Sequence, residues 1–329
     1  MKILGMGNAL VDVLAKLNAD TTLSELNLPK GSMQLIDETK RNHIFEVISE
    51  MPQKLTAGGC ASNTLAALAR MGLTSGFIGK IGDDNYGKFY KEDVQGIGVT
   101  THLIEEKAAS GTAMALISPD GERTFGTYLG VSGELSSDNL DTEIFSRYNY
   151  FYVEGYLVQN YDLIESAMRL AKSLGLKVAI DAASYNVVED NRAFFLQLID
   201  QYVDIIFANE EEAKALTQLP PEEAIRALSQ NVEIAVVKVG SKGAYAMRDG
   251  ELVKVPALTA DVIDATAAGD FFAAGFLYGL SLEKPMRECA QLGSLFASQV
   301  IQVIGTRLDD KTWEKIKADV KKIVSSSPD

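Results

Sequence analysis

Short apolar runs alternate along the chain with longer stretches in which apolar residues recur at helical spacing. The apolar runs predict buried strands, among them Lys2–Met6, Phe77–Ile78, Tyr150–Val153, Lys177–Ile180, Ile205–Ala208 and Ile234–Val239. The helical patterns between them lie at Ala61–Met71, Tyr161–Leu174, Arg192–Tyr202, Pro221–Gln230 and Met286–Ile301. This alternation predicts an α/β fold, with a mostly parallel sheet flanked by helices.

Two regions depart from the alternation. Residues 10–37 and 100–127 contain extended runs and a Pro119-Asp120-Gly121 turn, with no helix between the strands. We expect them to pair into a small inserted β-sheet that covers a site on the main domain as a lid. The expected division is 1–9, 38–99 and 128–329 for the α/β core, and 10–37 and 100–127 for the lid.

The charge of the chain limits its partners. It has 31 Lys and Arg against 45 Asp and Glu, a net charge of −14. Such a surface repels nucleic acid and anionic membranes, so we expect neither as a partner. The longest apolar run, Phe271 to Leu280, is too short to span a bilayer, and no signal peptide is recognisable, so we expect a cytoplasmic protein.

The motif Asp264-Ala265-Thr266-Ala267-Ala268-Gly269-Asp270 leads from a strand into a helix. Its small residues let a ligand approach the backbone, and the free N–H groups of Ala267, Ala268 and Gly269 favour anionic oxygens. Asp270 could accept the proton of an attacking hydroxyl. The same residues equally fit a helix cap with small side chains chosen for packing.

Two further elements offer hydrogen bonds to a ligand with hydroxyl groups. Gly58 and Gly59 precede a helix whose first turn carries Asn63, and Asn8 and Asp12 follow the first strand. The double glycine could admit a ligand, or it could be an ordinary turn. Asn8 and Asp12 could bind sugar hydroxyls, or they could be ordinary polar loop residues.

Asn209 and Glu212 stand three residues apart at the start of a helix. They could organise Mg²⁺ and its waters near phosphates. A helix N-cap followed by acidic residues requires the same sequence. Gly240 and Gly243, which follow the next buried strand, could hold the phosphates or ribose of ATP, or form a tight turn.

Two nucleotide-binding fingerprints are absent. The stretch from Gly5 to Asp12 has Leu10 where a dinucleotide-binding motif needs glycine, and the chain contains no P-loop motif. A dinucleotide-dependent oxidoreductase is therefore a weak alternative. A non-catalytic ligand-binding protein on the same fold is the other alternative to an enzyme.

Taken together and in this order, the motifs resemble those of the ribokinase or PfkB family of carbohydrate kinases, which includes adenosine kinase. The resemblance extends from Gly5 to about Leu308 and rests on Gly58–Asn63, Asn209–Glu212 and Asp264–Asp270. It implies a ribokinase-like fold and a kinase that uses ATP and Mg²⁺. Such an enzyme transfers the γ-phosphoryl group to a primary hydroxyl of a sugar or nucleoside.

The resemblance also implies a role for each matching residue. Asp270 would be the general base, with Ala267, Ala268 and Gly269 forming an anion hole; because main-chain N–H groups are used, an alanine with an ordinary φ at 267 would suffice. The acceptor would be bound by Asn8, Asp12, Gly59 and Asn63. The Mg²⁺ site would involve Asn209 and Glu212, and ATP would lie near Asn209, Lys238, Gly240 and Gly243. Asp264 and the Gly305-Thr306 region would contribute to a monovalent-cation site, such as one for K⁺.

The acceptor is less closely defined by the sequence. The stretch from Gly7 to Asp12 looks more like adenosine kinase than like fructose kinases, which favours a ribose-type or adenosine-like acceptor. Met33 in the lid could stack on a nucleobase or simply pack within the lid. Arg123 could approach a phosphate or stay solvated, and the lid could leave the protein a monomer or join two copies.

Overall fold

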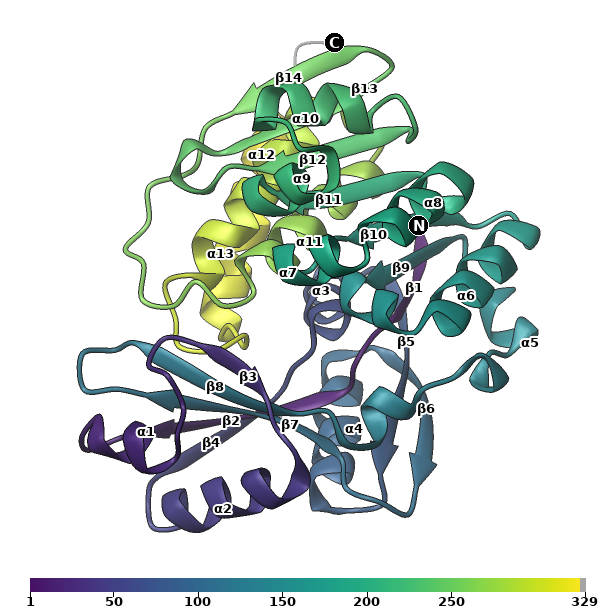
Figure 1. Cartoon of the computed structure of the whole chain (residues 1–329). Helices are drawn as coiled ribbons and strands as arrows, with labels where there is room; N and C mark the ends of the chain where they lie inside the picture. The colour runs from purple at the N-terminus through teal and green to yellow at the C-terminus, as the bar shows by residue number, and fades with distance from the viewer. Residues whose placement is uncertain (326–329) are drawn as a thin grey trace.

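Residues 1–325, the part of the chain that the computed structural model describes, form a nine-stranded sheet and a five-stranded sheet (Figure 1). The large sheet has the order β14-β13-β12-β11-β10-β9-β1-β5-β6. Its strands are parallel from β12 to β6, and β13 and β14 add an antiparallel hairpin at one edge. The strands of the large sheet are β1 (Lys2–Met6), β5 (Thr74–Gly82), β6 (Thr100–Glu106), β9 (Tyr150–Glu154), β10 (Lys177–Asp181), β11 (Ile205–Asn209), β12 (Ile234–Lys238), β13 (Ala244–Arg248) and β14 (Glu251–Val255).

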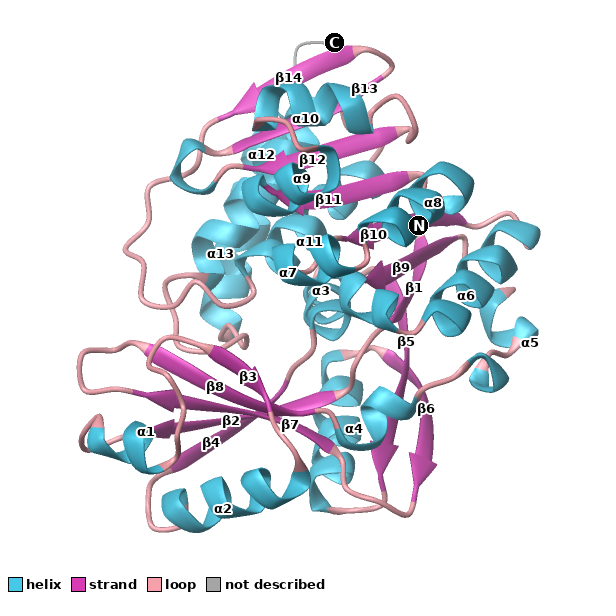
Figure 2. Cartoon of the chain, in the orientation of Figure 1, coloured by secondary structure: helices cyan, strands magenta, loops and turns pink. Residues whose placement is uncertain are grey.

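Helices cover both faces of this sheet (Figure 2), and a separate apolar core fills each side. One side carries α3 (Cys60–Arg70), α4 (Asn85–Ile97), α11 (Ala268–Ser281), α12 (Met286–Val300) and α13 (Asp310–Ser325). The other side carries α5 (Thr142–Phe145), α6 (Tyr161–Ser173), α7 (Tyr185–Asp190), α8 (Arg192–Tyr202), α9 (Glu210–Thr217) and α10 (Pro221–Leu228). Short 3₁₀ turns occur at Gly130–Glu134, Ser137–Asn139, Gly155–Gln159 and Gly240–Lys242.

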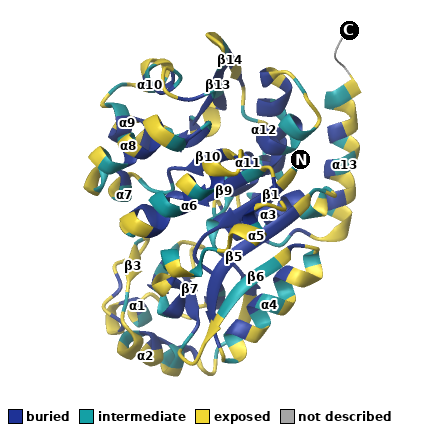
Figure 3. Ribbon diagram, turned by 90° about the vertical axis from the view of Figure 1, so that its right-hand side faces the viewer, coloured by how far each residue is buried: buried dark blue, intermediate teal, exposed yellow. Residues whose placement is uncertain are grey.

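The central strands are buried on both faces, which explains their continuous apolar runs. Figure 3 shows this as dark blue along β1, β5 and β9, whereas the edge strand β6 is mostly half-buried or exposed. The alternation in the sequence therefore predicted the α/β class and the parallel sheet correctly. No helix within residues 1–325 is long and apolar enough to cross a membrane.

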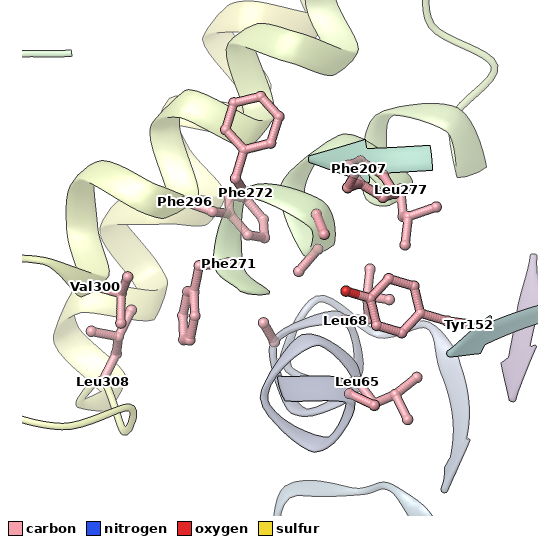
Figure 4. Packing of buried hydrophobic residues seen from close by; sticks show 14 of the residues in the cluster. Leu65, Leu68, Tyr152, Phe207, Phe271, Phe272, Leu277, Phe296, Val300 and Leu308 are labelled. Carbon is pink, nitrogen blue, oxygen red and sulfur yellow. The ribbon is translucent and has the colours of Figure 1, made fainter. Parts of the chain in front are cut away.

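Helix α11 is fixed by close packing against its neighbours, and this fixes Asp270 in its first turn. Phe271 and Phe272 extend from α11 into the core that α3 and α12 also line, with Leu65 and Leu68 on α3 (Figure 4). A Cβ at Gly275 would lie 2.3 Å from the main-chain oxygen of Leu292 on α12, so only glycine allows the two helices to approach this closely. The position of Asp270 is thus set by the rigid core.

The small sheet has the order β3-β8-β7-β2-β4 and is called the lid sheet below. Its strands are β2 (Leu10–Lys16), β3 (Met33–Leu35), β4 (Gln53–Ala57), β7 (Gly111–Ile117) and β8 (Arg123–Tyr128). Two further helices belong to this part of the chain: α1 (Thr21–Glu25) and α2 (Glu38–Ile48). In Figure 1 both lie along the lid sheet, and a Cβ at Gly126 of β8 would be 3.0 Å from Ile44 of α2. Two stretches of chain, 10–57 and 111–128, therefore build the lid sheet together.

Two helices and two strands differ from the expectations. Helix α1 lies within residues 10–37, where no helix was expected, and helix α2 was expected in the core but packs on β8 of the lid sheet. Thr100–Glu106 was expected in the lid but pairs in parallel with β5 in the large sheet, through the crossover helix α4. Gln53–Ala57 was expected in the core but pairs with β2 in the lid sheet. Both are edge strands with exposed side chains, so their residue patterns do not specify which sheet they join.

Candidate active site

Four neighbouring strands of the large sheet each end in a polar residue. The last residues of β9, β10, β11 and β12 are Glu154, Asp181, Asn209 and Lys238. In parallel strands these carboxyl ends meet at one edge of the sheet, where ligands bind in α/β folds. All four side chains line one cleft of about 1870 Å³.

The lid sheet forms the opposite wall of this cleft. Met33 and Leu35 on β3 and Phe125 on β8 line it, together with Asp12 on β2. Met33 is 49% exposed and Leu35 is 58% exposed, so both present apolar surface to the cleft. Pockets for one small ligand measure about 300–1,000 Å³, so this cleft has room for two substrates.

Asn8 is held in place by a carboxylate that we did not predict. Glu154 is 1% exposed, and its Oε1 accepts hydrogen bonds from the main-chain N–H of Asn8 at 2.8 Å and from Asn8 Nδ2 at 2.9 Å. Its Oε2 accepts from the N–H of Ala61 at 3.1 Å. Burial raises the pKa of Glu154, and these hydrogen bonds limit the rise. Glu154 thereby joins the end of β1 to the start of α3.

The two glycines before α3 are required by close contacts. Gly59 is the N-cap, with a φ of 91°, and a Cβ there would lie 2.2 Å from the main-chain oxygen of Asn8. A Cβ at Gly58 would lie 2.4 Å from Oδ1 of Asp12. The expected Gly-Gly element therefore brings Asn8 and Asp12 together at one end of the cleft.

The environment of Asp12 makes it a weaker acid than an exposed aspartate. Burial raises the pKa of Asp12 to about 7, against the opposing effect of Arg307 and Arg123. Arg307 is also bonded to Asp93 of α4 at 2.8 Å and to the main-chain oxygen of Ala57 at 2.7 Å. It thus ties the end of lid strand β4 to the core.

Asp270 and Asn63 meet as a pair. Asn63 Nδ2 donates to Oδ2 of Asp270 at 3.0 Å, and both residues line the cleft. Burial raises the pKa of Asp270 to about 7, although the bond from Asn63 opposes the rise. The side-chain oxygen Oδ1 of Asn63 is buried and accepts no hydrogen bond from the described residues. A ligand hydroxyl is the type of donor that this oxygen lacks.

The loop before Asp270 differs from our expectation in its backbone. Ala267 was expected to have an ordinary φ, but its φ is 61°, in the left-handed region that favours glycine. This conformation turns the chain into α11. The N–H of Ala268 donates to the main-chain oxygen of Ala265 at 3.2 Å, so this amide already has a partner within the loop.

Lys238 lies directly beside this loop. A Cβ at Gly269 would be 3.0 Å from Lys238 Nζ, and Nζ donates to Oδ2 of Asp181 at 2.8 Å. Burial alone would lower the pKa of Lys238, but the carboxylates of Asp181, Glu212 and Asp270 outweigh it and raise the pKa. A charged ammonium therefore lies beside Gly269, the residue directly before Asp270.

Asn209 and Glu212 form a helix cap, which was one of the two interpretations of their spacing; the other was a role near Mg²⁺. Asn209 Oδ1 accepts from the N–H groups of Glu211 and Glu212, and the Glu212 carboxylate accepts from Asn209 N and Nδ2, both at 2.7 Å. Burial raises the pKa of Glu212 to about 7, against the opposing charge of Lys238.

Gly240 and Gly243 line and shape the remaining end of the cleft. Gly240 has a φ of 56° and Gly243 a φ of 101°, and a 3₁₀ turn joins them. A Cβ at Gly243 would lie 1.9 Å from the main-chain oxygen of Val255, and Val262, in the segment between β14 and α11, also lines the cleft and is 65% exposed. This end offers backbone amides and apolar surface together.

Comparison with known proteins defines the family. The model of the pfkB family carbohydrate kinases matches residues 31–313. The chain belongs to this family. Its members are kinases that use ATP to phosphorylate an alcohol group, and the chain is a sugar or nucleoside kinase of this PfkB class.

Relatives and solved structures agree with this assignment. An adenosine kinase from Sinorhizobium meliloti is 32% identical, with a TM-score of 0.87 over 97% of this chain and 99% of that one. A probable sugar kinase from Rhizobium etli is 31% identical, with a TM-score of 0.87 over 97% and 98% of the two chains. An uncharacterized sugar kinase from Archaeoglobus fulgidus is 28% identical over 73% of this chain and 96% of its own length.

The residues expected to hold Mg²⁺ fit an indirect role in this PfkB kinase. No group of three or more His, Cys, Asp or Glu side chains within residues 1–325 is arranged to hold a metal directly. The carboxylate of Glu212 nevertheless lines the cleft and keeps lone pairs beyond those bonded to Asn209. Mg²⁺ usually retains several waters, and these waters are suitable donors to Glu212.

The carboxylate of Asp264 does not fit the expected role in a monovalent-cation site. Its Oδ1 accepts from the N–H of Thr266 at 3.0 Å, and its Oδ2 accepts from the N–H of Gly305 at 2.8 Å. The guanidinium of Arg123 lies 2.8 Å from Oδ2 and balances its charge. Arg123 is therefore neither solvated nor free: it joins lid strand β8 to the start of the Asp264–Asp270 motif.

Three site residues escaped prediction: Glu154, Asp181 and Arg307. The first two shared a signal with residues that we did select, because each is the polar last residue of an apolar strand. Arg307 lies in a loop and meets Asp93 only through the fold, so no local pattern marks it.

Proposed function

We propose that this PfkB kinase transfers the γ-phosphoryl group of ATP to a primary hydroxyl of a nucleoside or a ribose-type sugar, with Asp270 as general base. The proposal rests chiefly on one observation: Asp270 lines the cleft directly after Gly269, and a Cβ at Gly269 would lie 3.0 Å from the ammonium nitrogen of Lys238. A base, an N–H donor and a positive charge are what phosphoryl transfer to an alcohol requires.

The acceptor would lie between Asn63 and the lid sheet. Its primary hydroxyl would approach Asp270. Its other hydroxyls would form hydrogen bonds with Asn8, Asp12 and the side-chain oxygen Oδ1 of Asn63. Asp270, with a pKa of about 7, is ionised in a large fraction of molecules near neutral pH and basic enough to receive a proton. The position of Asn63, 3.0 Å from Oδ2, keeps the carboxylate oriented.

ATP would occupy the end of the cleft that Gly240 and Gly243 line. Its γ-phosphate would then reach the start of α11, where the helix N-terminus favours negative charge. When bound, Mg²⁺ would neutralise phosphate charge, with Asn209 and Glu212 holding its waters. We include no monovalent cation in the mechanism, since Arg123 already balances Asp264.

The two walls of the acceptor region favour a nucleoside. One wall is polar, with Asn8, Asp12 and Asn63, and suits the hydroxyls of a ribose. The other is apolar, with Met33 and Phe125 on neighbouring strands in register, and suits a flat base. The adenosine kinase among the similar structures supports this choice.

A turnover assay tests the proposal. The protein would be incubated with ATP, Mg²⁺ and, in turn, adenosine, other nucleosides, ribose and fructose, while ADP release and the phosphorylated product are both measured. We expect the highest kcat/KM with a nucleoside, and a kcat lower by about 10²–10⁴-fold with every acceptor when Asp270 is replaced by Asn. ADP release that is equal with and without every acceptor would refute the kinase proposal. A preference for free sugars over all nucleosides would refute the acceptor assignment alone.

A further inference from the structure

Lys238 and Asp181 form a largely buried ion pair in which both partners line the cleft. Lys238 is the last residue of β12 and Asp181 the last residue of β10, with β11 between them in the sheet. Their side chains are 14% and 8% exposed, and both line the cleft. The pair therefore reaches across the end of β11, whose last residue is Asn209.

We propose that Lys238 binds the γ-phosphoryl group during its transfer and that Asp181 positions Lys238 for this contact. The inference rests on the proposed kinase function; it gives Lys238, which was expected only near ATP, a specific contact, and it gives Asp181, which was not predicted, a role. It is based on the position of Lys238 Nζ. This atom lies 2.8 Å from Oδ2 of Asp181 and 3.0 Å from the position that a Cβ at Gly269 would occupy.

The donors of Lys238 support the contact. An ammonium has three N–H donors, and among the described residues Lys238 donates only to Asp181. The other two N–H donors have no partner among the described residues, and Lys238 lines the cleft. Because Gly269 has no side chain, the space 3.0 Å from Nζ, where its Cβ would stand, is left open.

Asp181 is placed to act through Lys238. Its Oδ2 accepts the hydrogen bond from Nζ, and its Oδ1 accepts from the N–H of Ala183 at 3.1 Å, which orients the carboxylate toward the ammonium. Ala183 has a φ of 67°, a conformation that the bond to Asp181 supports. The loop after β10 thus fixes Asp181, and Asp181 in turn fixes Lys238. Glu212 and Asp270 are the other carboxylates that attract this ammonium.

The step itself is balanced. The acceptor oxygen forms a bond to the γ-phosphorus while the bond from that phosphorus to the β–γ bridging oxygen breaks. The acceptor proton passes to Asp270, and ADP leaves with the electron pair of the broken bond. Lys238 exchanges no proton; it stabilises the charge on the γ-phosphoryl oxygens throughout the step.

The first test compares nucleotides that do and do not carry a γ-phosphate. Binding of β,γ-methylene-ATP and of ADP would be measured by calorimetry for wild type, Lys238→Gln, and Lys254→Met, which removes an exposed ion pair with Glu222. We expect the wild type to prefer the ATP analogue, Lys238→Gln to lose most of that preference, and Lys254→Met to retain it. Equal preference in wild type and Lys238→Gln would overturn the inference alone. A wild type that binds neither nucleotide would overturn the proposed function as well.

The second test separates catalysis from charge balance. Lys238→Gln should lower kcat by about 10²–10³-fold, the usual loss for one transition-state donor, with little change in the acceptor KM. Asp181→Asn should lower kcat less, and Asp181→Asn/Lys238→Gln should be as slow as Lys238→Gln. The double variant leaves no unpaired charge and guards against failure to fold. Recovery of wild-type kcat in the double variant would show that the pair serves only stability and would overturn the proposal.

Discussion

Replacing Asp270 by Asn should slow the enzyme and stabilise the fold at the same time. The carboxylate is 7% exposed, and its burial raises its pKa from 3.8 to about 7. A raised pKa means that the folded protein holds this proton more tightly than the unfolded chain does. Stability from this group is therefore complete below about pH 4, declines as the pH rises, and is lost above about pH 7.

The size of the effect follows from the pKa. A difference of one in pKa corresponds to about 1.4 kcal/mol, so the ionised Asp270 destabilises the fold by about 4 kcal/mol above pH 7. The amide introduced by Asp270→Asn would still accept the bond from Asn63 but would bury an NH₂ group, at a cost of about 1–2 kcal/mol. The net gain at pH 8 is about 2–3 kcal/mol. For a chain of this length it corresponds to a Tm increase of about 3–4 °C.

Thermal unfolding from pH 5 to pH 8 measures this gain, and kcat measured on the same samples should fall by about 10²–10⁴-fold. The Tm difference should be greatest at pH 8 and near zero at pH 5, where the gain from removing the carboxyl group, about 1.7 kcal/mol, is offset by the cost of the buried NH₂ group. Asp84→Asn is a matched control. Burial alone would raise the pKa of Asp84, but hydrogen bonds from Ser110 and Gly87 lower it, so its replacement should give no gain at pH 8. A Tm for Asp270→Asn at or below that of wild type at every pH would refute the reasoning.

Three other substitutions test separate features of the site. Ala267→Gly should relieve the left-handed backbone at φ 61° and stabilise the protein by up to about 1 kcal/mol in denaturant unfolding, with kcat within about twofold; a loss of stability would contradict the strain. Arg123→Met should leave the buried Asp264 without its countercharge and destabilise the protein by about 3–5 kcal/mol. Adding Asp264→Asn should restore part of this loss, and strict additivity of the two changes would argue against the pair. Gly59→Ala would place a methyl group 2.2 Å from the main-chain oxygen of Asn8 and should raise the acceptor KM at least about tenfold while the KM for ATP changes little; equal effects on both would indicate general disruption.

The sequence predicted the elements whose burial leaves a clear pattern. Strands such as Ile205–Asn209 are buried on both faces and read as continuous apolar runs, so their parallel arrangement was recognisable. The edge strands Gln53–Ala57 and Thr100–Glu106 were assigned to the wrong parts of the fold because their half-exposed side chains fit either sheet. Pairing choice depends on tertiary contacts that a local pattern does not contain.

Short motifs in the sequence predicted several of the residues that meet in the cleft. The Asp264–Asp270 motif directed attention to Asp270, and Gly58–Asn63 to the residue that bonds it. The pairing of Arg123 with Asp264 and of Lys238 with Asp181 joins distant parts of the chain, so no spacing along the sequence marks either pair. The left-handed φ at Ala267 was missed because alanine, unlike glycine, gives no sign of such a conformation.

The way in which the lid sheet is assembled has a consequence for changing the substrate. Residues 10–57 and 111–128 build it together, and β2 and β7, one from each stretch, lie paired at its centre. A foreign lid can therefore not be grafted as a single cassette, because both stretches must be exchanged in register. Leu10 and Leu129, at the junctions of the two stretches with the core, also line the cleft. Exchanging residues at either junction would therefore also change the surface that meets the ligand. Recombination between relatives should preserve function only when both stretches come from one parent.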